Sequence, residues 1–584
     1  MCSIIGYYGK NLAAPILVKG LQKMEYRGYD SVGVATKTDT EILVKKGVGK
    51  VVEVNTKVQL DDLPGMVGIG HTRWATHGEV SDKNAHPHPS NSGKIAIVHN
   101  GIVENYAEIK EVLSSKGYKF TSDTDTEVVA NLIQANFDES NDVKQTMIKT
   151  VSQLKGHFAF VVIFEDGTLA AARFHEPLIV GIGKNSHYLS SDVLGFIEKT
   201  DDVIYLDNED FVIINQNGLK ISKFDGSPAE YQITKVSKEF ADVYKGDYAH
   251  FTLKEISEQP KTILQAGDDK RIGEVADLIS NAKNLYITGS GTSYNAARIS
   301  KYLFSKYAKL KIEPIISSEL PFSPDSIEEN STLIAISQSG ESADVLEAVK
   351  IAKQSNSKVL SIVNHLNSSL SQESDSVINL DCGPEIGVAA TKSFTSQLAI
   401  LYKITNKICN ECLNLDWQKV SDGISKVLED NSKIKELAND LKEVSDIYIL
   451  GRGIHFPIAK EAALKLKELT YIHAEGIPGG ELKHGPLALM DSNVYVIIIN
   501  PDDSTFQETL NSANEIKARG AKIIGISNKK NSVYDYWIEI PEIDEALYPL
   551  IEIIPIQLLA YFAALEKDTD PDYPRNLAKS VTVK

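Results

Sequence analysis

The sequence contains few cysteines and no apolar run long enough to cross a membrane. Its longest apolar stretches, Val494–Ile499 and the interrupted Ile551–Leu565, fall short of the ~20 residues that a membrane-spanning helix needs. No basic stretch followed by an apolar one stands near the N-terminus, so no signal peptide is predicted. Four cysteines in 584 residues cannot form the disulfide framework of a small secreted protein. A reducing, cytoplasmic location is therefore predicted.

Positive charge is also scarce, because 61 lysines and arginines stand against 79 aspartates and glutamates, a net charge of −18. An acidic chain repels phosphate backbones and anionic lipid surfaces, which argues against nucleic acid and membranes as partners. Any anionic small molecule would have to be bound by local backbone N–H groups, hydroxyls or a few placed cations. At about 100–200 residues per domain, the length indicates about three to five domains.

The first part of the chain, to roughly residue 240, alternates short β-rich runs with Gly, Asn and Asp turns. Two helical patterns interrupt these runs, near Pro15–Met24 and Thr126–Gln134. Together they predict an α+β layer domain. A charged, strand-poor segment follows at about Thr234–Asp269, and we interpret it as a linker with a lead-in helix.

From about residue 274, strand–loop–helix units predominate and the unit is duplicated. Three β-rich runs at 285–289, 332–337 and 359–364 recur in the same order at 447–451, 494–500 and 523–528. Two tandem copies of one parallel α/β fold are therefore predicted, although generic strands can resemble one another by chance. A proline-punctuated tail is expected either to be disordered or to lie in an active site. The predicted domains are 2–225, a linker at 226–273, repeats at 274–425 and 426–570, and a tail at 571–584.

Cys2 directly follows the initiator methionine, so removal of Met1 would place a thiol and a free α-amino group on one residue. An α-amine titrates near pH ~8 and a thiol near ~8.5, which lets the amine act as the base that activates the sulfur. A cysteine at this position can equally be a small apolar residue at the start of a chain.

Five segments in fixed order favour the catalytic interpretation. Asn100 offers a side-chain amide and an Asn-Gly turn presents the Gly101 N–H, so the two could hold a tetrahedral oxyanion. Arg73 can bind an α-carboxylate through two hydrogen bonds, and Asp125 can hold an α-ammonium group. The segments are Cys2–Gly6, Tyr26–Ser31, His71–Gly78, His99–Gly101 and Ser122–Glu127.

Together these segments closely resemble the glutaminase domain of the N-terminal-nucleophile amidotransferases. The resemblance implies an αββα layer fold with glutamine as substrate. It makes Cys2 the nucleophile, places Arg27 near it and lets Trp74 gate the exit path of ammonia. The residues that it implies for glutamine binding are Arg73, Trp74, Thr76, His77 and Asp125.

Two groupings could indicate other chemistry. Five histidines cluster in the first domain, but their spacing fits no standard metal site and Pro87 stiffens the only close pair. Cys409 and Cys412 form a lone CxxC with no second pair, so ordinary core or surface cysteines are favoured over a redox or zinc site. The histidines are His71, His77, His86, His88 and His99.

In the first repeat, two hydroxyl-rich loops, Gly289–Ser293 and Ser337–Ser342, each lie between a predicted strand and helix. Backbone N–H groups, hydroxyls and the helix dipole at such a point form an anion site. Neither loop has the Walker lysine or fits G-x-G-x-x-G with its downstream acid, so a single phosphate is favoured over a nucleotide. Simple helix capping is the alternative for either loop alone.

The two loops resemble the sugar-isomerase (SIS) domain, a phosphosugar-binding α/β fold that also occurs in tandem. The resemblance places Thr292 and Val388 beside the sugar. Two positions depart from it, since Ser290 stands where bacterial relatives are expected to have Cys and Ala390 where Ser is usual. The second departure removes a possible contact to a sugar hydroxyl. The phosphate-binding residues that the resemblance implies are Ser293, Ser337, Gln338, Ser339 and Ser342.

Glu461, Lys465 and Glu468 recur at i, i+4 and i+7 on one helix face, a pattern that alone indicates a solvated row of ion pairs. Segments after this helix change the interpretation. They closely resemble, nearly end to end, the isomerase half of a family of aminotransferases that move glutamine nitrogen onto a sugar phosphate. These segments are Tyr471–Glu475, Gly480–Pro486 and Pro574–Val583.

This resemblance implies that Lys579 forms an imine with the ketose C2, which requires a partly neutral amine in a shielded site. Glu468 would move the proton between C1 and C2, His484 would open the sugar ring, and Lys465 would assist. In relatives His484 comes from the neighbouring subunit, so a homodimer or higher homo-oligomer is expected. No metal or organic cofactor is expected, because the imine serves as the electron sink.

The predicted function is transfer of the amide nitrogen of glutamine to fructose 6-phosphate and isomerisation to glucosamine 6-phosphate, with ammonia passing inside the protein. One alternative is an ammonia-dependent or deaminating phosphosugar enzyme, against which the intact front domain argues. The other is a non-catalytic SIS-domain phosphosugar sensor, against which the retention of Glu468, His484 and Lys579 argues.

Overall fold

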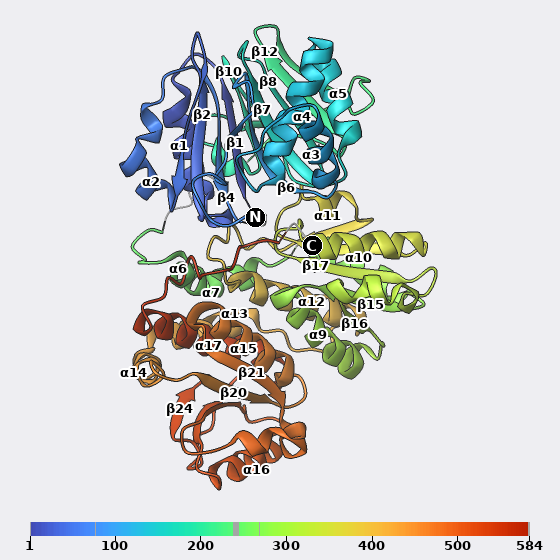
Figure 1. Cartoon of the computed structure of the whole chain (residues 1–584). Helices are drawn as coiled ribbons and strands as arrows, with labels where there is room; N and C mark the ends of the chain where they lie inside the picture. Colours follow the sequence, from blue (N-terminus) through green and yellow to red (C-terminus); the bar gives the residue numbers. More distant parts are fainter. Residues whose placement is uncertain (1, 76, 237–244, 268, 582–584) are drawn as a thin grey trace. The chain divides into compact units, whose positions relative to one another are not determined.

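The computed structural model describes residues 2–75, 77–236, 245–267 and 269–581 and divides the chain into two compact units (Figure 1). The first unit comprises Met1–Val243 and the terminal Ala578–Lys584, and the second comprises Tyr244–Leu577. Thr76, predicted to bind glutamine, lies outside the described residues.

Two antiparallel sheets form the centre of the first unit. The larger sheet contains, in spatial order, β14 (Thr234–Lys235), β11 (Asp202–Tyr205), β9 (Ile179–Gly183), β10 (Ser186–Ser190), β1 (Ser3–Tyr8), β4 (Val67–Arg73), β2 (Ser31–Lys37) and β3 (Ile42–Val48). The smaller contains β13 (Gly218–Lys223), β12 (Asp210–Asn215), β8 (Leu169–Phe174), β7 (Gly156–Phe164), β6 (Ile95–Val103) and β5 (His88–Pro89).

The sheets pack face to face through a buried apolar layer that includes Ile4, Val98 and Val161. Figure 1 shows α1 and α2 on one side of the two sheets and α3, α4 and α5 on the other. This arrangement confirms the predicted αββα layers. The helices are α1 (Ala13–Met24), α2 (Val51–Val58), α3 (Tyr106–Ser115), α4 (Asp125–Ser140) and α5 (Val143–Gln153).

The helix predicted near Thr126–Gln134 is longer in the structure, because both of its ends are set by polar residues outside the apolar pattern. Thr124 caps the start of α4 by accepting a hydrogen bond from the Glu127 N–H, and Asn141 ends the helix in the left-handed conformation. The capped end holds Asp125, a predicted site residue, in the first turn.

The second unit contains two parallel sheets, each of five strands in the order 2-1-3-4-5, which confirms the predicted duplication. The first sheet contains β16 (Glu313–Ile316), β15 (Leu285–Gly289), β17 (Thr332–Ser337), β18 (Lys358–Val363) and β19 (Ser376–Asn379). The second contains β21 (His473–Pro478), β20 (Asp446–Gly451), β22 (Tyr495–Ile499), β23 (Lys522–Ser527) and β24 (Tyr536–Glu539).

Helices surround both sheets, and α12 and α17 are their most buried members. The candidate span Glu545–Glu566, which contains α17, is long and apolar enough to cross a membrane, but 94% of its most apolar window is buried, as in a core helix. The helices are α6 (Phe251–Ser257), α7 (Gln259–Gln265), α8 (Asp269–Ser280), α9 (Gly291–Leu303), α10 (Ala343–Gln354), α11 (Ser369–Gln372), α12 (Lys392–Ile408), α13 (Trp417–Glu429), α14 (Ser432–Asp440), α15 (His455–Thr470), α16 (Phe506–Lys517) and α17 (Tyr548–Glu566).

The elements differ from the predicted domain limits in two places. β14 pairs with β11, so the larger sheet of the first unit extends beyond position 225. The limit predicted at 425 falls inside the continuous α13. The described part of the segment interpreted as a linker with one lead-in helix instead carries α6, α7 and the start of α8, all of which belong to the second unit.

The first half of the C-terminal tail is fixed to the second unit by side-chain contacts. Asp572 is almost fully buried and accepts hydrogen bonds from the N–H groups of Phe251 and Thr252, at 2.9 and 2.8 Å, at the start of α6. The Arg575 N–H donates to the hydroxyl of Tyr471, the residue that ends α15, at 2.6 Å. The tail is thus irregular but packed up to this point, which excludes the disordered alternative for these residues.

One disulfide, between Cys409 and Cys412, lies directly after α12. The two intervening residues, Asn410 and Glu411, have positive φ angles of 54° and 61°, and the two cysteine Cα atoms lie 5.5 Å apart. The expectation of ordinary core or surface cysteines is therefore wrong, because a left-handed turn after the helix brings the two sulfurs together.

Candidate active sites

Cys2 lies just before β1 and is half-buried among residues from other parts of the first unit. The Trp74 N–H donates to its sulfur at 3.1 Å. The Asn100 amide and the Arg27 guanidinium donate to its carbonyl oxygen, at 3.2 and 3.4 Å. Burial raises the pKa of the Cys2 thiol, and the Trp74 N–H and the charge of Arg73 oppose this effect only in part. Three predicted site residues therefore meet at the predicted nucleophile.

Asn100 and Gly101 lie inside the nine-residue β6, paired with Ala159 and Phe158, so the predicted Asn-Gly turn is wrong. Gly101 still has a left-handed φ of 100°, as in a turn. A Cβ at this position would lie 2.1 Å from the carbonyl oxygen of His157, so only glycine fits. Gly101 thus has the φ of a turn residue although the strand continues through it to Val103.

His71 fixes the orientation of the Asn100 side chain. Its Nε2 lies 3.1 Å from Asn100 Oδ1 and 2.9 Å from the carbonyl oxygen of His99. Both partners are acceptors, so Nε2 carries the proton. Burial lowers the pKa of His71 to about 3, which keeps the ring neutral. The donor end of the Asn100 amide consequently faces Cys2, a role that the sequence grouping of histidines as possible metal ligands did not reveal.

Arg73 lies at the end of β4 and donates hydrogen bonds to the carbonyl oxygens of His77, Gly78 and Glu79. Burial lowers the pKa of Arg73, while the charges of Cys2 and Asp125 act in the opposite direction. The structure thus brings both the predicted nucleophile and Asp125 within electrostatic range of Arg73.

The remaining predicted residues of this site occupy its edge. Asp125 is buried and accepts a hydrogen bond from the Val103 N–H at 2.9 Å. The Trp74 ring meets Tyr29 edge-on at 5.8 Å, and the His77 ring meets Tyr106 at 5.6 Å. These contacts hold the segment after β4 around the guanidinium of Arg73.

Arg27 is held by a carboxylate that the sequence did not single out. Asp192 accepts a hydrogen bond from the Tyr26 hydroxyl at 2.6 Å and pairs with the Arg27 guanidinium at 3.3 Å. Asp192 also caps the short helix Val193–Gly195. The sequence could indicate Asp192 only as a helix-capping residue, because its ion pair with Arg27 joins residues far apart in the chain.

In the second unit, the two hydroxyl-rich loops lie at the same edge, since they follow the neighbouring parallel strands β15 and β17. Ser337 Oγ accepts a hydrogen bond from the Gly340 N–H at 3.0 Å and lies 3.4 Å from Ser342 Oγ, just before α10. Ser339 Oγ accepts one from the Glu341 N–H at 3.2 Å. The loop therefore gathers hydroxyls at a helix N-terminus, the arrangement that suits a phosphate.

The other loop is joined to α12 and to a neighbouring turn. The Gln397 amide donates to Ser293 Oγ at 3.1 Å, and the hydroxyls of Ser290 and Ser317 lie 2.6 Å apart. The carbonyl oxygen of Gln338 accepts a hydrogen bond from the Asn364 N–H at 3.2 Å. Ser290, the position that departs from the expected cysteine, thus joins its loop to Ser317 at the start of the short helix Ser317–Phe322.

Lys465 and Glu461 are fully buried, so the interpretation of their helix face as a solvated ion-pair row is wrong. Lys465 Nζ lies 2.6 Å from Glu468 and 3.3 Å from Glu461, and it donates to Thr292 Oγ1 at 3.1 Å. Burial lowers the pKa of Lys465, but the two carboxylates outweigh burial and raise it overall, so the ammonium persists.

This network joins α15 of the second repeat to the first repeat. The Thr292 hydroxyl and the Asn295 amide, both from α9, donate to the two oxygens of Glu461 at 2.9 and 2.8 Å. Asn295 stands three residues after Thr292 and hence on the same helix face, but no motif distinguished it in the sequence. Glu468 is therefore held next to the loop that carries Thr292.

Three predicted residues lie outside this network. The Val388 N–H donates to the Asp572 carbonyl oxygen at 3.4 Å, which places the loop of Val388 and Ala390 against the tail. His484 is exposed at the end of the short helix Gly479–His484. Lys579 falls in the segment grouped with the first unit, so the second unit by itself does not contain it.

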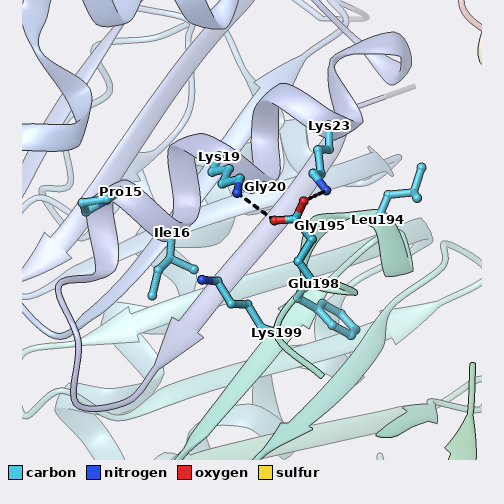
Figure 2. A pocket seen from close by; sticks show the side chains of 10 residues that line it. Pro15, Ile16, Lys19, Gly20, Lys23, Leu194, Gly195, Glu198 and Lys199 are labelled. Atoms are coloured by element: carbon cyan, nitrogen blue, oxygen red, sulfur yellow. Dashed lines mark hydrogen bonds and ion pairs between the residues drawn. The ribbon is translucent and has the colours of Figure 1, made fainter. Parts of the chain in front are cut away.

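A pocket of about 190 Å³ on the first unit lies between α1 and the segment 194–199 (Figure 2). Lys19 and Lys23 on α1 both pair with Glu198, at 2.8 and 2.5 Å. None of the predicted site residues lines this pocket.

Comparison with protein families gives the class of the chain. Residues 71–197 match the glutamine amidotransferase domain, and residues 278–406 and 440–567 each match the SIS domain. The chain is thus a glutamine amidotransferase followed by a tandem pair of SIS domains. It is 42% identical, over all of both chains, to glutamine–fructose-6-phosphate aminotransferase [isomerizing] from Thermococcus kodakarensis and to that from Pyrococcus horikoshii. The chain belongs to the glutamine–fructose-6-phosphate aminotransferase family.

Solved structures give a consistent result for the second unit. The C-terminal domain of glucosamine-fructose-6-phosphate aminotransferase from Francisella tularensis is 36% identical, with a TM-score of 0.52, and covers 56% of this chain and 100% of its own. Tagatose-6-phosphate ketose/aldose isomerase from Escherichia coli is 22% identical, with a TM-score of 0.50, over 56% of this chain and 95% of its own. The second likeness concerns the fold alone.

Proposed function

We propose that the chain transfers the amide nitrogen of glutamine to fructose 6-phosphate and isomerises the product to glucosamine 6-phosphate, releasing glutamate. The 42% identity, over the full length of both chains, to relatives named for this reaction supports the proposal. The observation that carries it is that one chain holds both a cysteine site with a placed amide donor and a buried Lys465–Glu468 pair beside a hydroxyl-rich loop.

In the glutamine half-reaction, Cys2 Sγ attacks the amide carbon, and the α-amine freed by removal of Met1 accepts the thiol proton. Asn100 Nδ2 and the Gly101 N–H stabilise the oxyanion. The α-ammonium group returns this proton to the amide nitrogen of the tetrahedral intermediate, which expels ammonia and leaves a thioester that water hydrolyses to glutamate. Arg73 binds the α-carboxylate and Asp125 the α-ammonium group, with Trp74, Thr76 and His77 completing the glutamine site.

In the sugar half-reaction, the phosphate binds at the loop of Ser337 and at Ser293, and His484 opens the ring. The Lys579 amine condenses with the C2 carbonyl and releases water, and ammonia then replaces the lysine nitrogen at C2. Glu468 removes a proton from C1 and returns it to C2, while the ammonium of Lys465 orients that carboxylate.

Chain length supports the assignment of Lys579. Arg575 is hydrogen-bonded to Tyr471, the residue that ends the helix of Glu468. Lys579 is the fourth residue after Arg575, a reach of at most about 14 Å along the chain. A tail fixed at this point can therefore present its lysine to a sugar near Glu468.

The proposal includes a homodimer in the cytoplasm, with glutamine and fructose 6-phosphate as its small-molecule partners. The exposure of His484 supports the dimer, because a catalytic side chain outside its own buried network suits a role in the site of a neighbouring subunit. Sedimentation of the full chain tests this part separately.

Two variants test the proposal. Cys2→Ala should abolish glutamine-dependent synthesis while leaving isomerisation of fructose 6-phosphate intact, and Lys579→Arg should abolish isomerisation while leaving glutamine hydrolysis intact. Lys567→Arg, at another lysine near the C-terminus, is the matched control and should leave both activities unchanged. Loss of both activities in either of the first two variants would contradict the assignment of two separate sites.

A further inference from the structure

The two repeats differ in the chemistry of equivalent loops. Gly451–His455 follows β20 as Gly289–Ser293 follows β15, and Asn500–Thr505 follows β22 as Ser337–Ser342 follows β17. The first repeat presents hydroxyls in these loops. The second repeat has His455 at the position of Ser293 and acidic residues, Asp502 and Asp503, in the other loop. The loops of the first repeat therefore suit an anionic ligand, whereas those of the second repeat carry charged side chains of their own.

His455 is the first residue of α15 and is fully buried between two carboxylates. Its Nδ1 lies 2.9 Å from both oxygens of Glu552, a fully buried residue of α17. Its Nε2 lies 2.9 Å from Asp503 Oδ2. Because both ring nitrogens face acceptors, both carry protons and the ring is an imidazolium.

The surroundings support this charge state. Burial lowers the pKa of His455, but Glu552 and Asp503 outweigh burial and raise it to about 10. Asp503 is fixed in turn, since its Oδ1 accepts hydrogen bonds from the N–H and the hydroxyl of Thr505, each at 2.8 Å. The other titratable groups around the carboxylates are Asp502, Tyr548 and, on α12, Tyr402.

We propose that His455 is a positioning residue for the sugar reaction: its bonds to Glu552 and Asp503 fix the first turn of α15 and thereby the placement of Glu468. The proposal rests on the proposed function, in which Glu468 transfers the proton. It identifies a histidine that touches no substrate and acts through the helix on which both residues lie.

The geometry explains how a distant contact can matter. Glu461 and Glu468 follow His455 by six and thirteen residues, about 9 and 20 Å along a helix that rises about 1.5 Å per residue. The helix is thus fastened at its start by the ionic contacts of His455, and near its middle by the hydrogen bonds that Glu461 accepts from Thr292 and Asn295 of α9. A proton-transferring carboxylate that shifts by about 1 Å can lose about 100-fold in rate.

Stability alone accounts poorly for such a group. Buried ion pairs are often no more stabilising than well-packed apolar side chains of similar volume, because desolvation opposes their attraction. Unlike apolar contacts, the two N–H groups of the ring, one shared between both oxygens of Glu552 and the other directed to Asp503, each at 2.9 Å, specify a single position for the helix terminus. This specificity is what proton transfer at Glu468 requires.

Three substitutions at one position separate the two contacts. In His455→Asn the amide can replace Nδ1 towards Glu552, in His455→Gln it can replace Nε2 towards Asp503, and His455→Leu removes both contacts. His473→Gln is the matched control, since His473 forms an exposed pair with Asp446 in the same repeat. Each variant of the full chain is assayed for isomerisation, for borohydride trapping of fructose 6-phosphate on Lys579 and for glutamine hydrolysis.

We expect kcat for isomerisation to fall about 10–100-fold in His455→Leu, with KM within about threefold, because the proton-transferring group is displaced while the phosphate loop is not. His455→Asn should recover most of this loss and His455→Gln less, since Glu552 lies on the main packing partner of α15. Trapping and glutamine hydrolysis should stay within about twofold of the unmodified chain, because neither step uses Glu468.

The outcomes distinguish the two levels of the proposal. Absence of trapping in the unmodified chain would overturn the proposed function and this inference with it. Trapping in the unmodified chain with undiminished isomerisation in His455→Leu would overturn the inference alone. Equal losses in all three variants, or a parallel loss of trapping and isomerisation, would reduce His455 to a residue needed only for folding and would also overturn it.

Discussion

Replacing Asn100 with aspartate removes one hydrogen-bond donor at Cys2 with almost no change in shape. The Asn100 Nδ2 lies 3.2 Å from the Cys2 carbonyl oxygen, and the proton on His71 Nε2 holds the other end of the amide. In Asn100→Asp, a carboxylate oxygen would take the place of Nδ2 and bring negative charge to the point where the oxyanion develops.

The magnitude follows from the loss of one of two donors. Removing a single oxyanion-hole donor costs about 100–1,000-fold in kcat, or about 3–4 kcal/mol, and the Gly101 N–H would remain. Asn100→Ala should therefore fall in this range, and Asn100→Asp at or beyond its upper end. His71→Phe should cost less, about tenfold, because it frees the amide to rotate without removing it.

The assay is steady-state glutamine hydrolysis, with isomerisation of fructose 6-phosphate as the control for folding of the second unit. KM for glutamine should change little, since Arg73 and Asp125 remain. A kcat for Asn100→Asp within threefold of the unmodified chain would refute the assignment of Asn100 as an oxyanion donor. A loss in His71→Phe greater than that in Asn100→Ala would refute the proposed link between the two residues.

Further predictions concern the second unit. The folded-state pKa of His455, about 10, exceeds its ordinary value of about 6.5, so its contribution to stability is complete below about pH 6.5 and is lost as pH rises through 10. This contribution is at most about 5 kcal/mol. The melting temperatures of the unmodified chain and of His455→Leu should therefore converge as the pH rises from about 6.5 to about 10. A difference in melting temperature that stays constant over this range would contradict the charged state of His455. Lys465→Met should lower the free energy of unfolding of this unit in urea by about 3–5 kcal/mol, because Glu461 and Glu468 would stay close together without their cation. Cys412→Ser should lower the stability of the same unit by no more than about 2 kcal/mol, since the disulfide closes a loop of only four residues; a larger loss in non-reducing melts would disprove this.

Motif order along the chain was sufficient to predict the layered first domain, the duplicated parallel sheets and the residues around Cys2. These features depend on local patterns, such as apolar strands followed by hydroxyl-rich loops, that the fold preserves. The turn predicted at Asn100-Gly101 failed because a left-handed glycine also fits inside a strand when a neighbouring carbonyl leaves no room for a Cβ.

The buried networks could not be predicted, because they join residues far apart in the sequence. Glu461 and Lys465 have the spacing of surface ion pairs, but the packing of α15 against α9 and the other elements around it buries them. The contact of His71 with Asn100 and that of His455 with Glu552 likewise depend on how elements pack. Helix periodicity gives the face on which a side chain lies, but not the element that covers that face.

The most direct test of the two-site account is to supply the full chain with fructose 6-phosphate, glutamine labelled with ¹⁵N at the amide, and an excess of unlabelled ammonium. In this account, ammonia released at Cys2 passes inside the protein and replaces the Lys579 nitrogen at C2 of the sugar. The account therefore predicts that the hexosamine 6-phosphate carries ¹⁵N. A product that carries only unlabelled nitrogen, or glutamate formed without any hexosamine phosphate, would contradict it.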